Sequence, residues 1–337
     1  MAEPSKNRHD YPQICVAGAG AIGITITARL HLAGYRVGMI ARGVTLAFIQ
    51  QHGIELIDLD GSHRARPDVA TAAEHSRADI LFLCPKSHDL PALAESVSHL
   101  ITPHTTVVPV INGIPWWYFD GIDGKWNGRR IEAVDPHGVL KQTIPSSLII
   151  GTTTMITAER THLGTARTFN PLQMTVGELD DSPSDRLDQL AVILSKAGIA
   201  SRKAPRIRNA IWTKVVRNLI SNPVTAITGA TLRQNFGNSY LVGISRQMLQ
   251  EVLPVIAAHN AVLEVDPETI LESGRKLGDV KTSMLQDLER GNELELASIC
   301  DAVIELGRFY GIDMPVTQAI SNLAHFKSSP GKDAFAA

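Results

Sequence analysis

The first half of the chain alternates short apolar runs with segments in which apolar positions recur at helical spacing. The apolar runs cover residues 13–17, 36–40, 79–84 and 105–111. Runs of this kind are typical of strands buried on both faces of a parallel sheet, with helices between them. Two later runs, 148–156 and 165–176, predict strands that complete the sheet.

The second half of the chain has a different pattern. Ser182 and Pro183 predict the N-cap and first turn of a helix, and Gly198 predicts its end. Beyond about residue 205 only helical spacing remains. The helices predicted there cover residues 206–221, 238–260, 267–277 and 293–310. We therefore expect an α/β domain over residues 1–204 and an all-α domain over residues 205–337.

Composition and charge argue against several classes of protein. The 32 Lys and Arg nearly balance the 34 Asp and Glu, which favours neither nucleic acid nor a membrane as a partner. No apolar run is long enough to span a bilayer, and residues 1–10 are too polar for a signal peptide. Cys15, Cys84 and Cys300 lie singly, and the 12 His form no ligand-like pair, so we expect no disulfide and no metal. These features predict a cytoplasmic protein.

A glycine-rich motif follows the first predicted strand and opens the first predicted helix. It consists of Gly18, Ala19, Gly20, Ala21, Ile22 and Gly23. The first glycine permits a tight turn, the second lets a pyrophosphate approach the backbone closely, and the third lets the helix pack on the strand. The phosphates then lie at the positive end of the helix. The motif predicts a Rossmann-type dinucleotide-binding domain.

The end of the second predicted strand bears on the choice of cofactor. NAD-binding domains carry an acidic residue there for the ribose 2′-hydroxyl, whereas an Arg accommodates the 2′-phosphate of NADP. This chain has no acid at that point and has Arg42. The interpretation as an NADP (NADPH) site is favoured over that of an ordinary solvated Arg.

A polar stripe is predicted near the start of the second domain. On a continuous helix, Lys214, Asn218 and Asn222 lie at i, i+4 and i+8 and share one face. One interpretation is a Lys that protonates a developing alkoxide while the amides hold a polar substrate. The other is a solvated face, and spacing alone does not decide between them.

A third polar cluster surrounds Ser283 and Glu295. Its spacing indicates a helix, a stop at Gly291 and a second helix, whose positive end would favour Glu295. No catalytic role follows from this pattern by itself.

Taken together, these residues resemble one family, ketopantoate reductase (2-dehydropantoate 2-reductase), the NADPH enzyme of pantothenate synthesis. The resemblance extends over residues 13–324 and is carried by segments 18–23, 84–86, 111–113, 212–223 and 283–287. It implies a Rossmann-type domain followed by an all-α, 6-phosphogluconate-dehydrogenase-like C-terminal domain. It also implies an active site in the cleft between them and a small 2-keto acid as substrate.

The resemblance also implies roles for individual residues. The family's general acid corresponds to Lys214, and Glu295 to the acid that orients the substrate hydroxyl near that Lys. Residues matching Asn218 and Asn222 hydrogen-bond the substrate, and the residue matching Ser283 binds its carboxylate. The remaining correspondences are Lys86, which contacts the cofactor, and Asn112, which lies between cofactor and substrate.

Three departures from the family's common pattern leave the substrate open. They are segments 294–297, 152–158 and 114–119, the last an aromatic insertion that includes Trp116 and Trp117. All three could line the pocket for the substrate's side chain. The alternatives are a reductase of another branched or aromatic 2-keto acid and a non-catalytic NADPH-binding sensor. An opine-type dehydrogenase would need a His–Asp pair, which we do not find. A homodimer is left open, because a helical domain can offer an apolar pairing face.

Overall fold

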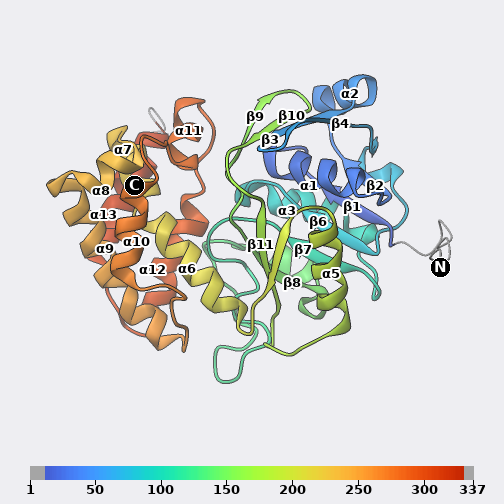
Figure 1. Ribbon diagram of the computed structural model, residues 1–337. Helices are drawn as coiled ribbons and strands as arrows, with labels where there is room; N and C mark the ends of the chain where they lie inside the picture. The colour runs from blue at the N-terminus through green and yellow to red at the C-terminus, as the bar shows by residue number, and fades with distance from the viewer. Residues whose placement is uncertain (1–11, 330–337) are drawn as a thin grey trace, which may run out of the picture. The chain divides into compact units, whose positions relative to one another are not determined.

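The computed structural model describes residues 12–329 (Figure 1). The chain divides into two compact units. Unit 1 comprises the described chain through Ile111, with Phe119–Arg129 and Gly138–Ile207. Unit 2 comprises Asn112–Tyr118, Arg130–His137 and the described chain from Arg208 onward.

Unit 1 is built on a parallel sheet of five strands in the order β5-β2-β1-β6-β7. These strands are β1 (Ile14–Ala17), β2 (Val37–Ile40), β5 (Asp68–Ala70), β6 (Ile80–Leu83) and β7 (Thr106–Pro109). Each neighbouring pair is parallel, with Val16 opposite Met39 on one side and Phe82 on the other. This is the strand order of a Rossmann domain and confirms the predicted fold class.

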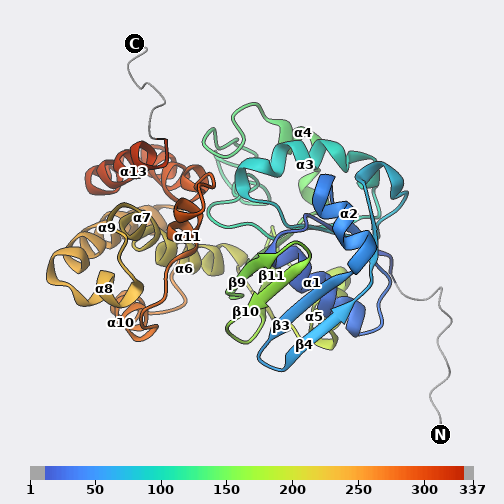
Figure 2. The same ribbon diagram turned by 90° about the horizontal axis from the view of Figure 1, so that it is seen from above.

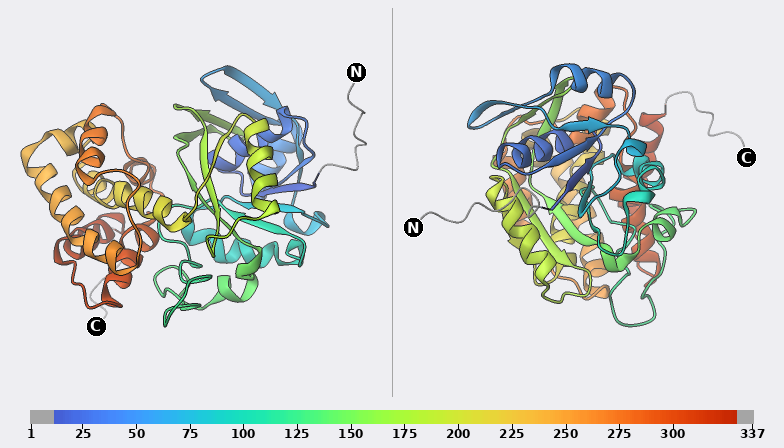
Figure 3. Two further views of the ribbon diagram at one scale, coloured as in Figure 1. Left: turned by 60° about the horizontal axis from the view of Figure 1, so that its bottom comes forward. Right: turned by 90° about the vertical axis from the view of Figure 1, so that its right-hand side faces the viewer.

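Helices cover both faces of this sheet because its strands are apolar on both. On one face, Ile26 and Leu30 of α1 (Ala21–Leu32) share a core with Leu190 and Leu194 of α5 (Asp185–Lys196). Figure 3 shows α3 (Leu90–Ser96) on the opposite side of the sheet from α5. The other helices of unit 1 are α2 (Gly43–His52), α4 (Val139–Thr143), η1 (Ala72–Glu74), η2 (Ser87–Asp89), η3 (Ser98–Leu100) and η4 (Ser146–Leu148).

Two smaller sheets accompany the parallel one (Figure 2). One has the order β4-β3-β10-β9 and the other β12-β11-β8. Their strands are β3 (Ile54–Asp58), β4 (Gly61–Ala65), β8 (Ile150–Thr154), β9 (Ala158–His162), β10 (Thr165–Thr168), β11 (Gln173–Glu178) and β12 (Ala200–Lys203). A parallel bridge between Val107 and Ile149 links the chain entering β8 to β7.

The prediction of one strand over residues 165–176 is wrong. This run forms β10 and β11, which lie in different sheets. Asn170 and Pro171 separate them: the Asn170 side chain accepts a hydrogen bond from the backbone N–H of Thr157 at 2.6 Å, and Pro171 has no N–H to donate to a ladder.

The predicted start of α5 is also wrong, by two residues. Ser184 is the N-cap, and its hydroxyl accepts a hydrogen bond from the N–H of Leu187 at 3.1 Å. The hydroxyl of Ser182 instead donates to Asp180 at 2.7 Å. Two Ser residues compete for the cap here, and their side-chain partners decide between them.

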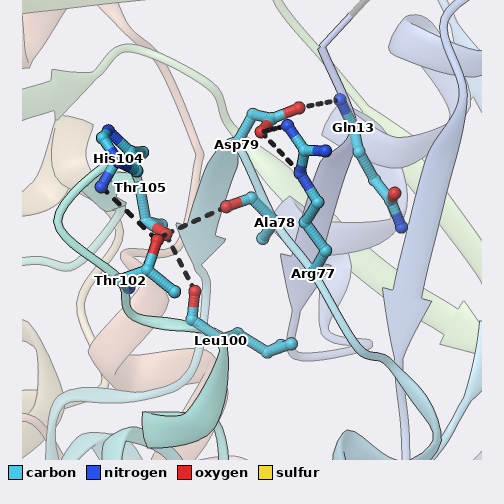
Figure 4. Close-up of polar contacts among 8 residues, drawn as sticks. All are labelled: Gln13, Arg77, Ala78, Asp79, Leu100, Thr102, His104 and Thr105. Carbon is cyan, nitrogen blue, oxygen red and sulfur yellow. Dashed lines mark hydrogen bonds and ion pairs between the residues drawn. The ribbon is translucent and has the colours of Figure 1, made fainter. Parts of the chain in front are cut away.

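Polar contacts tie together the strands of the parallel sheet where they begin (Figure 4). The carboxylate of Asp79, just before β6, accepts a hydrogen bond from the backbone N–H of Gln13 at 2.8 Å. It also accepts two from the guanidinium of Arg77, at 2.6 and 3.0 Å. The buried hydroxyl of Thr105, just before β7, lies 3.0 Å from the carbonyl oxygen of Ala78. The amino ends of β1, β6 and β7 are thereby held by side chains.

The part of unit 2 that the structure describes is helical and contains no strand. The long helices are α6 (Ile207–Leu219, whose first residue belongs to unit 1), α9 (Ser239–Ala258), α10 (Pro267–Lys276) and α13 (Pro315–Ser328); the shorter ones are α7 (Asn222–Thr228), α8 (Leu232–Gly237), α11 (Ser283–Glu289), the π-helix η5 (Ala297–Asp301) and α12 (Ala302–Arg308). Among residues 12–329, no helix is both long and apolar enough to cross a membrane. The predicted helix over 293–310 starts later, where the π-helix begins.

Two short segments from the middle of the chain belong to unit 2 through specific contacts. The carbonyl oxygen of Tyr118 accepts the guanidinium of Arg208 at 2.9 Å, and its hydroxyl lies 2.7 Å from the indole nitrogen of Trp212. The carboxylate of Glu305 accepts the backbone N–H groups of Glu132 and Ala133, each at 2.9 Å. Trp116 and Trp117, each 1% exposed, are thus interior residues of a segment that unit 2 holds.

Candidate active site

The glycine motif forms the turn between β1 and α1. Gly18 has a φ of +112°, and a Cβ there would lie 2.8 Å from the carbonyl oxygen of Cys84. A Cβ on Gly23 would overlap the carbonyl oxygen of Gly18. At Gly20, the residue preceding α1, a Cβ would meet nothing closer than 4.0 Å. The fold therefore requires the first and third glycines, whereas the second leaves the backbone open to a ligand such as a pyrophosphate.

Two cations lie at the same carboxyl edge of the parallel sheet. Arg42 follows β2 and precedes α2, and its side chain is 89% exposed. Lys86 follows β6 and is half-buried. Asp89 lies 3.9 Å from the Arg42 guanidinium, a contact that the sequence did not predict because 47 residues separate the two. The residues of this edge fit a dinucleotide with an extra phosphate on its ribose.

Unit 2 brings together three of the predicted site residues. Glu295 is 5% exposed, and its carboxylate accepts the side-chain amide of Asn112 at 3.2 Å. Burial lowers the pKa of Lys214 to about 8, while the charge of Glu295 opposes that shift. Lys214 itself keeps partial exposure. This is a cation near its pKa at neutral pH, as suits a group that donates a proton.

A close contact between two backbone segments holds this cluster. Gly113 has a φ of +83°, and a Cβ there would lie 2.5 Å from the carbonyl carbon of Ser298. The N–H of Ile114 donates to the carbonyl oxygen of Ser298 at 2.8 Å. Ser298 lies in the π-helix, where the i→i−4 hydrogen-bond pattern is interrupted. Asn112 and Glu295 stand next to these two segments, so the contact sets their separation.

The predicted polar stripe is wrong in part. Lys214 and Asn218 lie on α6, but that helix ends at Leu219, and Asn222 is the first residue of α7. The interruption lies at Ser221, whose φ of −121° is not helical and whose hydroxyl bonds the carbonyl oxygen of Arg217 at 2.7 Å. Asn222 is consequently buried, whereas Asn218 is half-buried.

Ser283 is the exposed first residue of α11, a helix that packs against α7. The residue before it, Thr282, caps α11 and bonds the hydroxyl of Thr225 on α7 at 2.7 Å. Ser283 is thus carried close to the helix that begins at Asn222.

The predicted site residues fall into two groups. Those assigned to the cofactor belong to unit 1, except Asn112, and those assigned to the substrate and to proton transfer belong to unit 2. No sequence signal pointed to Ser298, whose backbone contact with Gly113 joins segments that are distant along the chain. Sequence reasoning also did not single out Arg217, which lies on α6 with Lys214. Arg217 is three residues after Lys214, a spacing that places it on the same face of a helix.

Comparison with known proteins identifies the family. The model described as Ketopantoate reductase PanE/ApbA matches residues 14–181, and the model of its C terminal matches residues 206–328. A 2-dehydropantoate 2-reductase of Mesorhizobium japonicum is 34% identical over 311 residues, which cover 91% of this chain and 95% of that protein. The chain belongs to the ketopantoate reductase family. It is an oxidoreductase of this family.

Solved structures show the same fold. A candidate ketopantoate reductase from Ralstonia solanacearum MolK2 superposes with a TM-score of 0.90 at 31% identity, covering 95% of this chain and 98% of that one. D-mandelate dehydrogenase, solved with NADH and anilino(oxo)acetate, has a TM-score of 0.81 at 22% identity, with 94% and 98% covered. The likeness to the ketopantoate reductase family therefore extends over nearly the whole chain, and the second structure bears on the fold alone.

Proposed function

We propose that this protein uses NADPH to reduce the 2-keto group of 2-dehydropantoate (ketopantoate) to the hydroxyl of pantoate, with Lys214 as the general acid. The observation that carries the proposal is Lys214 beside the buried Glu295, in a chain that belongs to the ketopantoate reductase family. NADPH, when bound, supplies the hydride.

The residues of unit 2 have separate tasks in this reaction. Lys214 donates a proton to the keto oxygen as negative charge develops there, an interaction that strengthens toward the transition state. Glu295 keeps a negative charge near Lys214, which favours the protonated amine. Asn112 donates to Glu295 and orients that carboxylate. Asn218, Asn222 and Ser283 hydrogen-bond the substrate.

The preference for NADPH rests on the carboxyl edge of the parallel sheet. The exposed Arg42 follows β2, and no acid takes the position that would hold a 2′-hydroxyl. Arg42 binds the 2′-phosphate, and it exchanges a weak contact with Asp89 for a stronger one with a doubly charged group. Lys86 contacts the cofactor from the end of β6.

A second candidate function is reduction of another branched or aromatic 2-keto acid with the same chemistry. D-mandelate dehydrogenase shares the fold, and mandelate is an aromatic 2-hydroxy acid. Segments 294–297 and 152–158 depart from the common pattern of the ketopantoate reductase family. Segment 114–119 departs as well, but its residues are buried. A change of side-chain pocket is compatible with an unchanged Lys214 and Glu295.

The deciding experiment is the loss of NADPH absorbance with ketopantoate, beside a panel that includes phenylglyoxylate and 2-oxo-3-methylbutanoate. The proposal expects the highest kcat/KM for ketopantoate. Faster turnover of another member would support the second candidate. Tight NADPH binding with no turnover of any 2-keto acid would contradict both and favour the NADPH sensor.

A further inference from the structure

Arg217 lies on the same face of α6 as Lys214. Through its last two turns α6 is buried at every position except Lys214, Arg217 and Asn218, which keep partial exposure. Residues at i, i+3 and i+4 are neighbours on a helix surface. The three polar side chains therefore form the only stripe of these turns that meets solvent in the described chain.

The guanidinium of Arg217 has no hydrogen-bond or ion-pair partner among residues 12–329. Its half-buried counterpart in unit 1, Arg186, differs, because it bonds the carboxylate of Glu178 at 2.7 Å. Burial lowers the pKa of Arg217 with no carboxylate opposing the shift, whereas Glu178 raises the pKa of Arg186. A cation that loses hydration without gaining a partner is costly, so Arg217 contributes poorly to stability.

The charges around Lys214 favour an anion at Arg217. Lys214 and Arg217 are positive, and Glu295 supplies a negative charge that acts on Lys214. The carboxylate of Glu295 also accepts a hydrogen bond from the side-chain amide of Asn112. Among the described residues, no carboxylate is a cause of the pKa shift of Arg217. An Arg fork matches the two oxygens of a carboxylate, and a 2-keto acid carries its carboxylate on the carbon next to the keto group.

We propose that Arg217 binds the carboxylate of the 2-keto acid whose keto oxygen Lys214 protonates. The inference rests on the proposed function and deepens it. Ser283, which the family resemblance assigns to the same carboxylate, supplies a neutral hydrogen bond. Arg217 supplies the charge that distinguishes an acid from its ester or amide.

The test compares Arg217→Met with wild type, Arg217→Lys and the control Arg275→Met, an exposed Arg on α10. Each protein is assayed with the best 2-keto acid and with its methyl ester. For Arg217→Met we expect kcat/KM to fall about 10- to 100-fold for the acid, the range for a lost hydrogen bond to a charged group. For the ester we expect less than about a twofold change, because no charge is lost there. Arg217→Lys should recover part of the loss, and Arg275→Met should match wild type.

Two outcomes of these measurements would overturn the inference. In the first, wild type prefers the acid and Arg217→Met keeps that preference, so the proposed function stands and Arg217 has no role in it. In the second, the acid preference stays but a fluorescence titration of Arg217→Met shows that its affinities for NADPH and NADH have both fallen, which assigns Arg217 to the cofactor.

A binding measurement covers the case in which no 2-keto acid is turned over and the proposed function fails. Oxalate is added to the protein with NADP⁺, and the shift in Tm is compared between wild type and Arg217→Met. A shift in wild type that Arg217→Met lacks supports a carboxylate site. Equal Tm shifts in the two proteins, or no shift in wild type, would also overturn the inference.

Discussion

The glycine turn of unit 1 and the Lys214 cluster of unit 2 are built in opposite ways. The turn is six consecutive residues, and the contact that makes Gly23 necessary is with Gly18 of the same motif. The cluster joins Asn112 to Glu295 across 183 positions of sequence. A local motif carries its own geometry, whereas an assembled cluster depends on packing far from its members, so substitutions should affect the two regions differently.

The largest effect should follow from removing the proposed proton donor of the assembled cluster. Lys214→Met is expected to lower kcat about 100- to 10,000-fold, the usual contribution of general acid catalysis. NADPH affinity should stay within about twofold, because the cofactor motif lies in unit 1. Stopped-flow turnover and NADPH fluorescence titration measure the two quantities. Lys276→Met, an exposed Lys on α10, is the control, and a turnover for Lys214→Met equal to that of the control would refute the assignment.

A substitution outside the reacting groups should also reach catalysis in unit 2. Gly113→Ala forces the segment away from Ser298, and displacement of Asn112 and Glu295 by about 1 Å should cost about 100-fold in kcat. Gly229→Ala is the matched control: its φ of +73° is equally unfavourable for Ala, but a Cβ there meets nothing within 4 Å. Both should lose about 1 kcal/mol of stability from the left-handed backbone. Equal kcat in the two variants would show that the contact does not position the site.

A smaller and more selective effect is expected at the cofactor edge. Arg42→Glu should raise the Kd for NADPH about 10- to 100-fold, from loss of a charged hydrogen bond, and leave the Kd for NADH nearly unchanged. Arg36→Glu, before the opposite end of β2, is the control. Equal weakening of both cofactors in Arg42→Glu would remove Arg42 from the 2′-phosphate.

The finest test of the assembled cluster is its pH dependence. As the proposed general acid, Lys214 must be protonated to act, and its pKa of about 8 means that kcat/KM should fall as the pH rises through about 8. Glu295→Gln removes the charge that raises this pKa, so the decline should begin at lower pH. Rate profiles between pH 6 and 10 measure the shift. A decline at the same pH in both proteins would mean that another group controls it.

Much of unit 1 followed from sequence because its signals are local. Four near-continuous apolar runs became β1, β2, β6 and β7, and the glycine motif fell between β1 and α1 as expected. The run at 165–176 failed because its apolar pattern continues across Asn170 and Pro171, and sheet membership is a long-range property. Likewise, Ser182 and Ser184 are equivalent as caps in sequence, and only their contacts separate them.

By itself, the sequence determined the Rossmann-type domain, the helical character of the second half and the family of the protein. Each of these depends on residue periodicity or on motifs a few residues long. Only the tertiary structure decided that α6 ends before Asn222, that the Gly113 segment meets the π-helix at Ser298, and that Arg217 is left without a partner among the described residues. The reason is physical: burial, charge compensation and backbone contact depend on neighbours that are distant along the chain, and periodicity carries no record of them.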